Sequence, residues 1–341
     1  MFKCKILGAL FFILPLFAAA QENYRVDTVA LKPGNSFRGL SVVNDRVIWV
    51  SGNKGTVGRS IDGGKSWKWI VVPGFENAEF RDIEAFDADT ALVMASGEPA
   101  YILKTYNGGE SWKRVYENPD KGMFLDAMEF WNNHAGIVIG DPIDGRFFVA
   151  RTFDGGQTWE DLPEKYRPLA DSGEALFAAS GTCMSKLDRD EAIFVTGGSR
   201  SRFFYRGKSV VLPLAQGSEA AGANSVAARD VKRRRGSRTL IVVGGDYRND
   251  TVSEGNCAYT KDGGKTWLVP ETPPAGYRSC VIYLGKQKVF TCGSSGVDIS
   301  NDGGQNFRLI TRDGYHVCRK AKDGKSVFLA GNGKIAQLVI F

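Results

Sequence analysis

The sequence lacks several features on which common classes of protein depend. No stretch beyond residue 20 holds eighteen consecutive apolar residues, so we expect no transmembrane helix there. There is no Gly-x-Gly-x-x-Gly motif opening a helix and no alternation of strands with helices, which leaves a nicotinamide-dependent oxidoreductase without support. A Gly-x-Ser-x-Gly element is also missing, so nothing indicates a serine nucleophile. Because the sequence has no such nucleotide-binding motif, we predict no cofactor.

Metal ligands and paired cysteines are scarce as well. The only histidines are His134 and His316, and the six cysteines form no Cys-x-x-Cys pair, so we expect no metal site. Cys280 and Cys292 flank a short hairpin, and counting equally from its tip places them opposite each other. Either a cross-strand disulfide or two buried free thiols fits that position.

The N-terminus reads as an export signal. Lys3 and Lys5 precede an apolar run that ends in three alanines, the pattern of a secretory signal peptide cleaved after Ala20. Its loss lowers the formal net charge from +6 to +4, because two lysines leave. We predict a secreted or periplasmic protein in which residues 21–341 form a single domain.

Positive charge is concentrated in only one place along the mature chain. Residues 232–235 read Lys-Arg-Arg-Arg, with Arg238 nearby, which is typical of a solvated hairpin tip. A nucleic-acid partner would require a larger basic surface, so we predict none.

Glycine and aromatic residues are abundant and occur in a repeated pattern. The pattern is [Ser/Thr]-x-[Asp/Asn]-Gly-Gly-x-[Ser/Thr/Asn]-[Trp/Phe], and apolar strands precede and follow it. Its acidic or amide side chain can bond downstream amides, and its glycines supply positive φ, so each copy predicts a structural hairpin turn. The third positions of the five copies are Asp62, Asn107, Asp154, Asp262 and Asp302.

The spacing of these turns predicts a β-propeller. Successive copies are 40–54 residues apart if one degenerate copy, Arg206-Gly207-Lys208, replaces the missing turn. Each repeat divides into four strands, and in the fourth repeat we assign the innermost strand to residues 174–180. The tail supplies three strands, and residues 24–31 can supply the fourth. We predict an all-β, seven-bladed propeller of four-stranded antiparallel blades, closed by pairing of the N- and C-terminal strands.

Charged and polar side chains gather where the innermost strands begin and in the loops on that same upper face. These are not the small apolar residues that a packed inner strand requires, and guanidinium groups suit carboxylate or phosphate ligands. An alternative is that Arg38 with Asp82, or Arg81 with Asp126, are salt bridges between blades. The predicted ligand-binding residues are Arg38, Arg81, Asp82, Asp126, Asp141, Arg146, Arg202, Asn224, Asp246, Tyr277, Arg278 and His316.

The five turns resemble the BNR or Asp-box repeat. Units such as VSGNKGTVGRSIDGGKSWKWI look most similar to the photosystem II stability/assembly factor family, and the likeness extends in weaker form over residues 24–341. That resemblance implies a seven-bladed ring that binds a protein or a small ligand, without known catalysis. From the arginines of the upper face we predict that the partner there is a protein, or an anionic small molecule or glycan. The arginine patch of that family cannot be traced residue by residue.

Sialidases resemble the chain in the same turns and in an arginine triad, for which Arg38, Arg81 and Arg278 are candidates. Gly39-Leu40 departs from the sialidase pattern, and no nucleophile pair is evident beyond Tyr277 with Glu174. A glycoside hydrolase acting on an anionic glycan would need two facing carboxylates, for which Glu98 and Glu174 are the first candidates. The sequence favours a binding module and leaves this enzyme as the alternative.

Overall fold

The computed structural model describes residues 22–188, 190–229 and 237–341. Regular structure in these ranges is β-strand, apart from the short 3-10 turn η1 (Glu164–Tyr166). Among the same residues, no helix combines the length and apolar character needed to cross a bilayer. The predicted signal peptide and the basic residues 232–235 lie outside the described residues.

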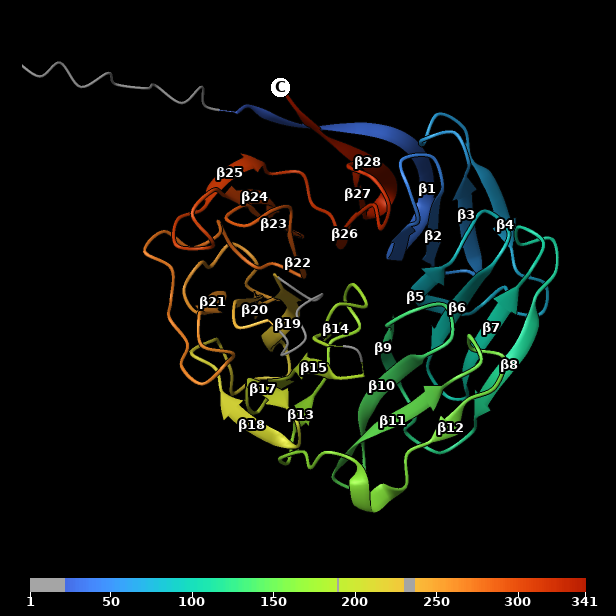
Figure 1. Ribbon diagram of the computed structural model, residues 1–341, viewed down its shortest axis with the longest axis horizontal. Coiled ribbons are helices and arrows are strands. Elements are labelled where there is room, and N and C mark those ends of the chain that lie inside the picture. The colour runs from blue at the N-terminus through green and yellow to red at the C-terminus, as the bar shows by residue number, and fades with distance from the viewer. Residues whose placement is uncertain (1–21, 189, 230–236) are drawn as a thin grey trace, which may run out of the picture.

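Antiparallel sheets stand side by side around a common centre, as Figure 1 shows. Four of them have four strands each, which confirms the all-β fold built from four-stranded antiparallel sheets. They are β5 (Glu79–Ala85), β6 (Ala91–Ser96), β7 (Ala100–Thr105) and β8 (Lys113–Asn118); β9 (Leu125–Phe130), β10 (Gly136–Ile143), β11 (Arg146–Thr152) and β12 (Glu160–Asp161); β14 (Met184–Lys186), β15 (Ala192–Val195), β17 (Arg202–Tyr205) and β18 (Lys208–Val211); and β22 (Cys280–Tyr283), β23 (Val289–Gly293), β24 (Gly296–Ser300) and β25 (Arg308–Thr311).

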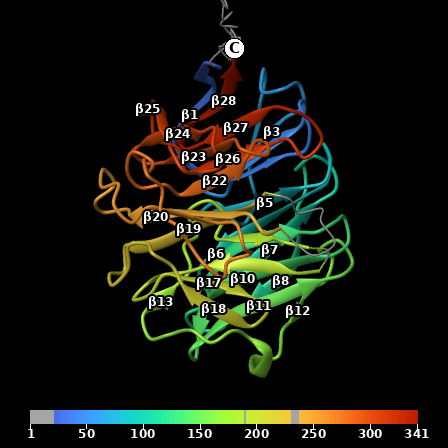
Figure 2. The ribbon, with the colours of Figure 1, turned by 60° about the vertical axis from the view of Figure 1, so that its left-hand side comes forward.

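The first strand of the chain pairs with the last strand in one sheet. The first part of β1 (Tyr24–Val42) pairs with β28 (Asn332–Ile340), and its last part pairs with β2 (Ile48–Gly52). Tyr24 lies opposite Ile340 in the first ladder, and Val42 lies opposite Ile48 in the second. Both ribbon views place β1 beside β28 (Figures 1 and 2). The remaining strands of this sheet are β3 (Thr56–Ser60), β4 (Lys68–Val71), β26 (Val317–Lys320) and β27 (Val327–Ala330).

The innermost strand of the fourth repeat differs from the prediction. Of residues 174–180 only β13 (Glu174–Ala175) is strand, and it joins β16 (Gly197–Gly198) in the next sheet. The inner strand is instead β14, which begins ten residues further on, because residues 176–182 leave the sheet and enter the centre of the molecule. The sheet that β13 and β16 join contains β19 (Ala221–Ala228), β20 (Leu240–Asp246) and β21 (Cys257–Thr260).

Apolar side chains fill the spaces between neighbouring sheets. One cluster joins Leu92 and Ile102 of one sheet to Leu125, Val138 and Phe148 of the next, all of them buried. Burial of this kind favours folding by roughly 25 cal/mol for each Å² of apolar surface removed from water.

Each Asp-box turn closes its own hydrogen bonds. In the first, Ser60 Oγ accepts from the amide of Gly64 at 2.9 Å and donates to Asp62 Oδ1 at 2.9 Å. Asp62 Oδ1 also accepts from the amide of Ser66 at 2.9 Å, and the same pattern recurs at Asn107, Asp154, Asp262 and Asp302. The turns therefore need no ligand to satisfy their polar groups.

The second glycine of the turn also packs against the preceding sheet. A Cβ added at Gly156 would lie 2.5 Å from Leu92, and one at Gly264 would lie 2.4 Å from Phe203. Both glycines also have positive φ. The glycine pair therefore serves the turn and the contact between sheets together.

Candidate functional site

A pocket of about 360 Å³ opens where the inner strands begin. Half of the predicted ligand-binding residues line it, and they come from different sheets. These residues are Arg38, Arg81, Asp126, Asn224, Tyr277 and His316. The geometry thus brings together side chains up to 278 positions apart in the sequence.

The floor of the pocket is part of residues 176–182, which we call the central segment. Leu176, Phe177, Ala178 and Ala179 line the pocket, and the amide of Leu176 donates to Asp141 Oδ1 at 2.8 Å. Ser180 Oγ donates to the carbonyl of Ser279 at 2.7 Å. The segment is therefore tied to strands on several sides of the centre.

The two arginines of the pocket bind this segment through its carbonyl oxygens. Arg38 donates to the carbonyl of Ala179, and Arg81 to that of Ala178, both at 3.3 Å. Arg81 also forms an ion pair with Glu79, with Nε 2.8 Å from a carboxylate oxygen. Within the described part of the chain Arg38 forms no ion pair, and burial together with the charge of Arg81 lowers the pKa of Arg38. A neighbouring anion would stabilise this guanidinium.

Asp126 is a buried acid whose hydrogen bonds are incomplete. Its side chain is 0% exposed, and neither carboxylate oxygen makes a hydrogen bond of standard geometry. Burial raises the pKa of Asp126 well above its usual range, with the charge of Asp141 adding to that effect and Arg81 opposing it. Asp126 therefore favours its neutral form, which can donate a hydrogen bond into the pocket.

His316 is likewise held in its neutral form. Its Nε2 lies 2.9 Å from Asn332 Oδ1 and 3.2 Å from Ser36 Oγ. Burial first, and then the charge of Arg38, lower the pKa of His316 to about 4. At neutral pH the unpaired positive charge of the pocket is therefore that of Arg38.

Aromatic rings form the wall beside these charges. Phe177 and Tyr247 have ring centroids 6.2 Å apart, and Tyr247 and Tyr277 6.4 Å apart, both pairs edge to face. Tyr277 is buried and donates its hydroxyl to Asn224 Oδ1 at 2.7 Å. An apolar or planar group could pack on this wall while an acidic group meets Arg38.

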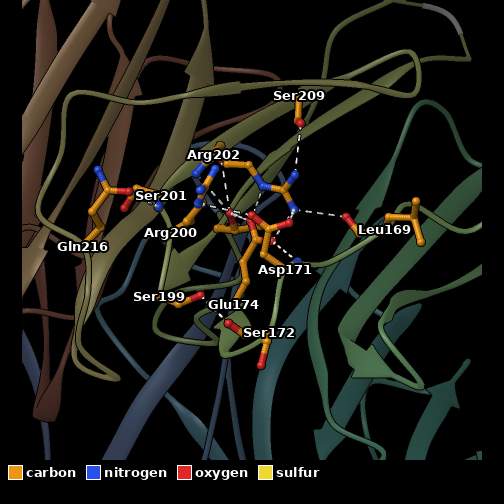
Figure 3. Close-up of polar contacts among 11 residues, drawn as sticks. Leu169, Asp171, Ser172, Glu174, Ser199, Arg200, Ser201, Arg202, Ser209 and Gln216 are labelled. Carbon is orange, nitrogen blue, oxygen red and sulfur yellow. Dashed lines mark hydrogen bonds and ion pairs between the residues drawn. The ribbon is translucent and has the colours of Figure 1, made fainter.

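Arg202 and Glu174 lie outside the pocket and bind each other. Figure 3 shows the two side chains pointing toward one another, with Arg200 and Asp171 beside them. Arg202 Nε donates to Glu174 at 2.8 Å, and Glu174 also accepts from Thr196 Oγ1. The second candidate acid, Glu98, is exposed and accepts from the amide of Gly122 at 2.9 Å. Neither candidate acid lines the pocket, so the geometry does not favour a glycoside hydrolase.

Arg278 is also absent from the pocket lining. It is 0% exposed and forms an ion pair with Asp298, with Nε donating at 2.6 Å. Its Nη1 donates to Ser295 Oγ and to the carbonyl of Tyr277, each at 2.7 Å. These contacts neutralise the charge of the Arg278 guanidinium and pair its hydrogen-bond donors within its own sheet.

Asp82 serves a contact between sheets. It accepts from the amide of Met128 at 2.9 Å, which ties β5 to β9. Ser225 makes the equivalent bond to the amide of Val281 at 3.0 Å. The salt bridges considered from the sequence, Arg38 with Asp82 and Arg81 with Asp126, are not among the ion pairs of the described residues.

Three further predicted residues hold loops or the central segment. Asp141 binds the amide of Leu176, and Arg146 donates to the carbonyl of Arg167 at 2.9 Å. Asp246 accepts from Asn249 Nδ2 at 2.9 Å, and it is partly exposed to solvent. None of the three lines the pocket.

Sequence reasoning did not select the carbonyl groups of the central segment. The run Ala178-Ala179-Ser180-Gly181 gives a signal in hindsight, because four small residues in succession fit a strand poorly. Phe177, Ser294 and Phe124 also line the pocket without having been selected. Over the residues that the structure covers, no group of histidine, cysteine or acidic side chains is arranged to hold a metal ion.

Comparison with protein families supports the repeat assignment. Residues 18–123 match the family described as "Photosynthesis system II assembly factor YCF48". The search of curated proteins returned no match.

Solved structures show a β-propeller fold over nearly the whole chain. "YCF48 bound to D1 peptide" is 17% identical with a TM-score of 0.63, covering 94% of this chain and 97% of that one. "YCF48 from Cyanidioschyzon merolae" is 15% identical with a TM-score of 0.65, covering 92% and 98%. A streptogramin B lyase reaches 0.65 at 14% identity, covering 94% and 98%, so the shared fold does not by itself specify an activity.

Proposed function

We propose that this chain, a BNR-type β-propeller similar to the photosystem II assembly factors, is a binding module that holds an acidic group of a protein partner in the pocket beside Arg38. We further propose that it acts after export and cleavage behind Ala20, with residues 21–341 as one domain. In this proposal the sheets form seven blades, closed by the pairing of β1 with β28.

The observation that carries the proposal is the unpaired charge of Arg38. The guanidinium is mostly buried, lines the pocket and has a carbonyl as its hydrogen-bond partner. Arg81 is already paired with Glu79, while Asp126 and His316 favour their neutral forms. One excess positive charge matches one singly charged carboxylate better than a doubly charged phosphate.

The pocket's size and lining favour a short protein segment as the ligand. A volume of about 360 Å³ suits a terminal carboxylate or an acidic side chain with a few neighbouring atoms. The aromatic wall offers packing for the adjoining apolar atoms. One of the solved relatives, YCF48, is bound to a D1 peptide, which agrees with a protein ligand at this fold.

The test measures peptide binding by fluorescence anisotropy. A labelled library of short peptides is prepared with free carboxylate ends and, in parallel, with amidated ends and no acidic side chains. We expect the acidic set to contain binders, and Arg38→Gln to weaken them roughly 10- to 100-fold, the equivalent of one charge-assisted hydrogen bond.

Arg146→Gln is the matched control, because Arg146 is a partly buried arginine outside the pocket. It should bind like the unaltered protein. Equal affinity of Arg38→Gln and unaltered protein for every binding peptide would refute the proposal.

A further inference from the structure

Three cysteine side chains meet between two neighbouring sheets. Cys280 of β22, Cys292 of β23 and Cys318 of β26 are each 0% exposed and unbridged. Cys280 lies opposite Cys292 in the ladder, as predicted from the hairpin. The sulfurs of Cys280 and Cys318 lie 3.7 Å apart across the boundary between the sheets. No part of the pocket function uses this cluster.

The surroundings make the three thiols unequal. Cys280 Sγ accepts from the amide of Cys318 at 3.4 Å and lies 3.7 Å from Nη1 of Arg319. Burial opposes ionisation of Cys280, but hydrogen bonds from the other two cysteines and the charge of Arg319 outweigh it and lower the pKa of Cys280. Burial raises the pKa of Cys318 and of Cys292. A thiolate beside a cation is the attacking group in thiol–disulfide exchange, so Cys280 is the nucleophile of the cluster.

We propose that Cys280 and Cys318 are a disulfide-forming pair that cross-links β22 to β26 under oxidising conditions. The sulfurs must close from 3.7 Å to about 2.05 Å, a change that the side chains and the two strands can share. Cys292 is already bound to the strand of Cys280 by the ladder, so only the bond to Cys318 joins separate sheets.

The oxidant in this step is a small-molecule disulfide such as glutathione disulfide. The Cys280 thiolate attacks one sulfur, forms a mixed disulfide and releases one glutathione thiolate. Cys318 then loses its proton and attacks Cys280 Sγ, which releases the second glutathione. Two protein thiols lose two electrons, the glutathione disulfide gains them, and the two protons pass to the released thiols.

Burial determines when this reaction can take place. All three sulfurs are sealed from solvent, so glutathione disulfide reaches Cys280 while the chain folds or when the sheets part, and Cys318 completes the bond as the sheets come together. It would lie directly behind the pocket, because Ser279 and His316 line the pocket and are joined by a hydrogen bond of 2.6 Å from Ser279 Oγ to the His316 carbonyl.

The experiment is oxidative refolding followed by peptide mapping. The reduced, denatured full chain is refolded in glutathione disulfide with reduced glutathione, alkylated and digested with trypsin without reduction. Trypsin separates the three cysteines into residues 279–286, 289–308 and 313–319, so mass spectrometry distinguishes every pairing. We expect residues 279–286 linked to 313–319, and a higher thermal midpoint that dithiothreitol lowers again.

Substitutions decide which cysteines take part. Cys318→Ala should abolish the linked peptide and the dithiothreitol-sensitive rise of the midpoint. Cys292→Ala should keep both, as should Cys257→Ala, which removes a buried thiol elsewhere. Should Cys318→Ala fail to fold, the Cys292→Ala result still decides, because its linked peptide can then contain only Cys318 as the nearby partner. A link between Cys280 and Cys292, or alkylation of all three cysteines after refolding, would overturn the proposal.

Discussion

Asp154 in an Asp-box turn and Asp126 in the pocket carry the same side chain, yet folding shifts their pKa values in opposite directions. Hydrogen bonds within the turn lower the pKa of Asp154 to about 2, whereas burial raises that of Asp126 well above its usual range. The turn supplies the Asp154 carboxylate with four hydrogen-bond donors, whereas neither carboxylate oxygen of Asp126 has a partner of standard geometry. Polar groups that are satisfied internally indicate structure, and groups left unsatisfied indicate a site for something else.

The largest expected effect is a difference in stability between variants of Arg278 and Arg38, two arginines that lie at similar positions in their repeats. Arg278→Ala leaves Asp298 as a buried, unpaired charge, which should lower the free energy of unfolding by about 3–5 kcal/mol. Arg38→Ala removes a guanidinium without an ion-pair partner, so its unfolding free energy should change by less than about 1 kcal/mol. Urea denaturation followed by tryptophan fluorescence measures both.

A similar loss of stability in the two variants would break this distinction. It would mean that Arg38 holds the central segment through Ala179 as firmly as Arg278 holds its own sheet. Arg146→Ala gives a baseline for removing a partly buried arginine elsewhere.

A second effect concerns the acid that holds the central segment. Burial raises the pKa of Asp141 to about 6 from an ordinary value of 3.8. A raised folded-state pKa contributes stability that is full below pH 4 and is lost as pH rises through about 6. Asp141→Asn keeps an acceptor for the Leu176 amide without this loss. Above pH 7 the variant should therefore be more stable than the unaltered protein, by about 3 kcal/mol at most.

Urea unfolding between pH 3 and pH 8 measures this difference. The two curves should meet near pH 4 and separate as pH rises. A constant difference across the range would show that Asp141 does not change its ionisation on folding.

The smallest effect should come from the turn. Asp154→Asn keeps the backbone bonds, because Asn107 occupies the same position in the second turn and accepts from Ser111 at 3.0 Å. A lowered folded-state pKa contributes stability above about pH 4 that is lost as pH falls toward 2. Asp154 is partly exposed, so after allowance for solvent screening the variant should lose less than about 1 kcal/mol at pH 7, and still less at pH 2.

Thermal melts at pH 7 and pH 2 test this expectation, with Asn107→Asp as the reciprocal variant. If Asp154→Asn lowered the free energy of unfolding by several kcal/mol at pH 7, folding would require the negative charge of this turn.

The turns could be read from the sequence because each is local. Ser60, Asp62, Gly64 and Ser66 bond one another within a few positions, so their residue types and spacing are sufficient. The all-β fold follows from the same repetition. The contact of the second glycine with the neighbouring sheet was not predicted, because its partner belongs to the preceding repeat.

The pocket could be predicted only in part. Arg38, Arg81 and His316 were found because they begin successive inner strands, and that position places them at one end of the sheets. Arg278 occupies the same kind of position, but Asp298 from β24 neutralises it. The central segment was taken for a strand, because its composition does not reveal that Arg38 and Arg81 bind its carbonyl groups.

The sequence by itself determined the turns, the repeated four-stranded sheets and the supply of arginines at one end of them, because those depend on neighbours along the chain. Tertiary structure decided which arginine keeps an unpaired charge, which acid stays neutral and which cysteines meet. Ion pairing and desolvation depend on distances across space, and residues such as Arg38 and Ala179, or Cys280 and Cys318, come together only when the sheets surround a common centre.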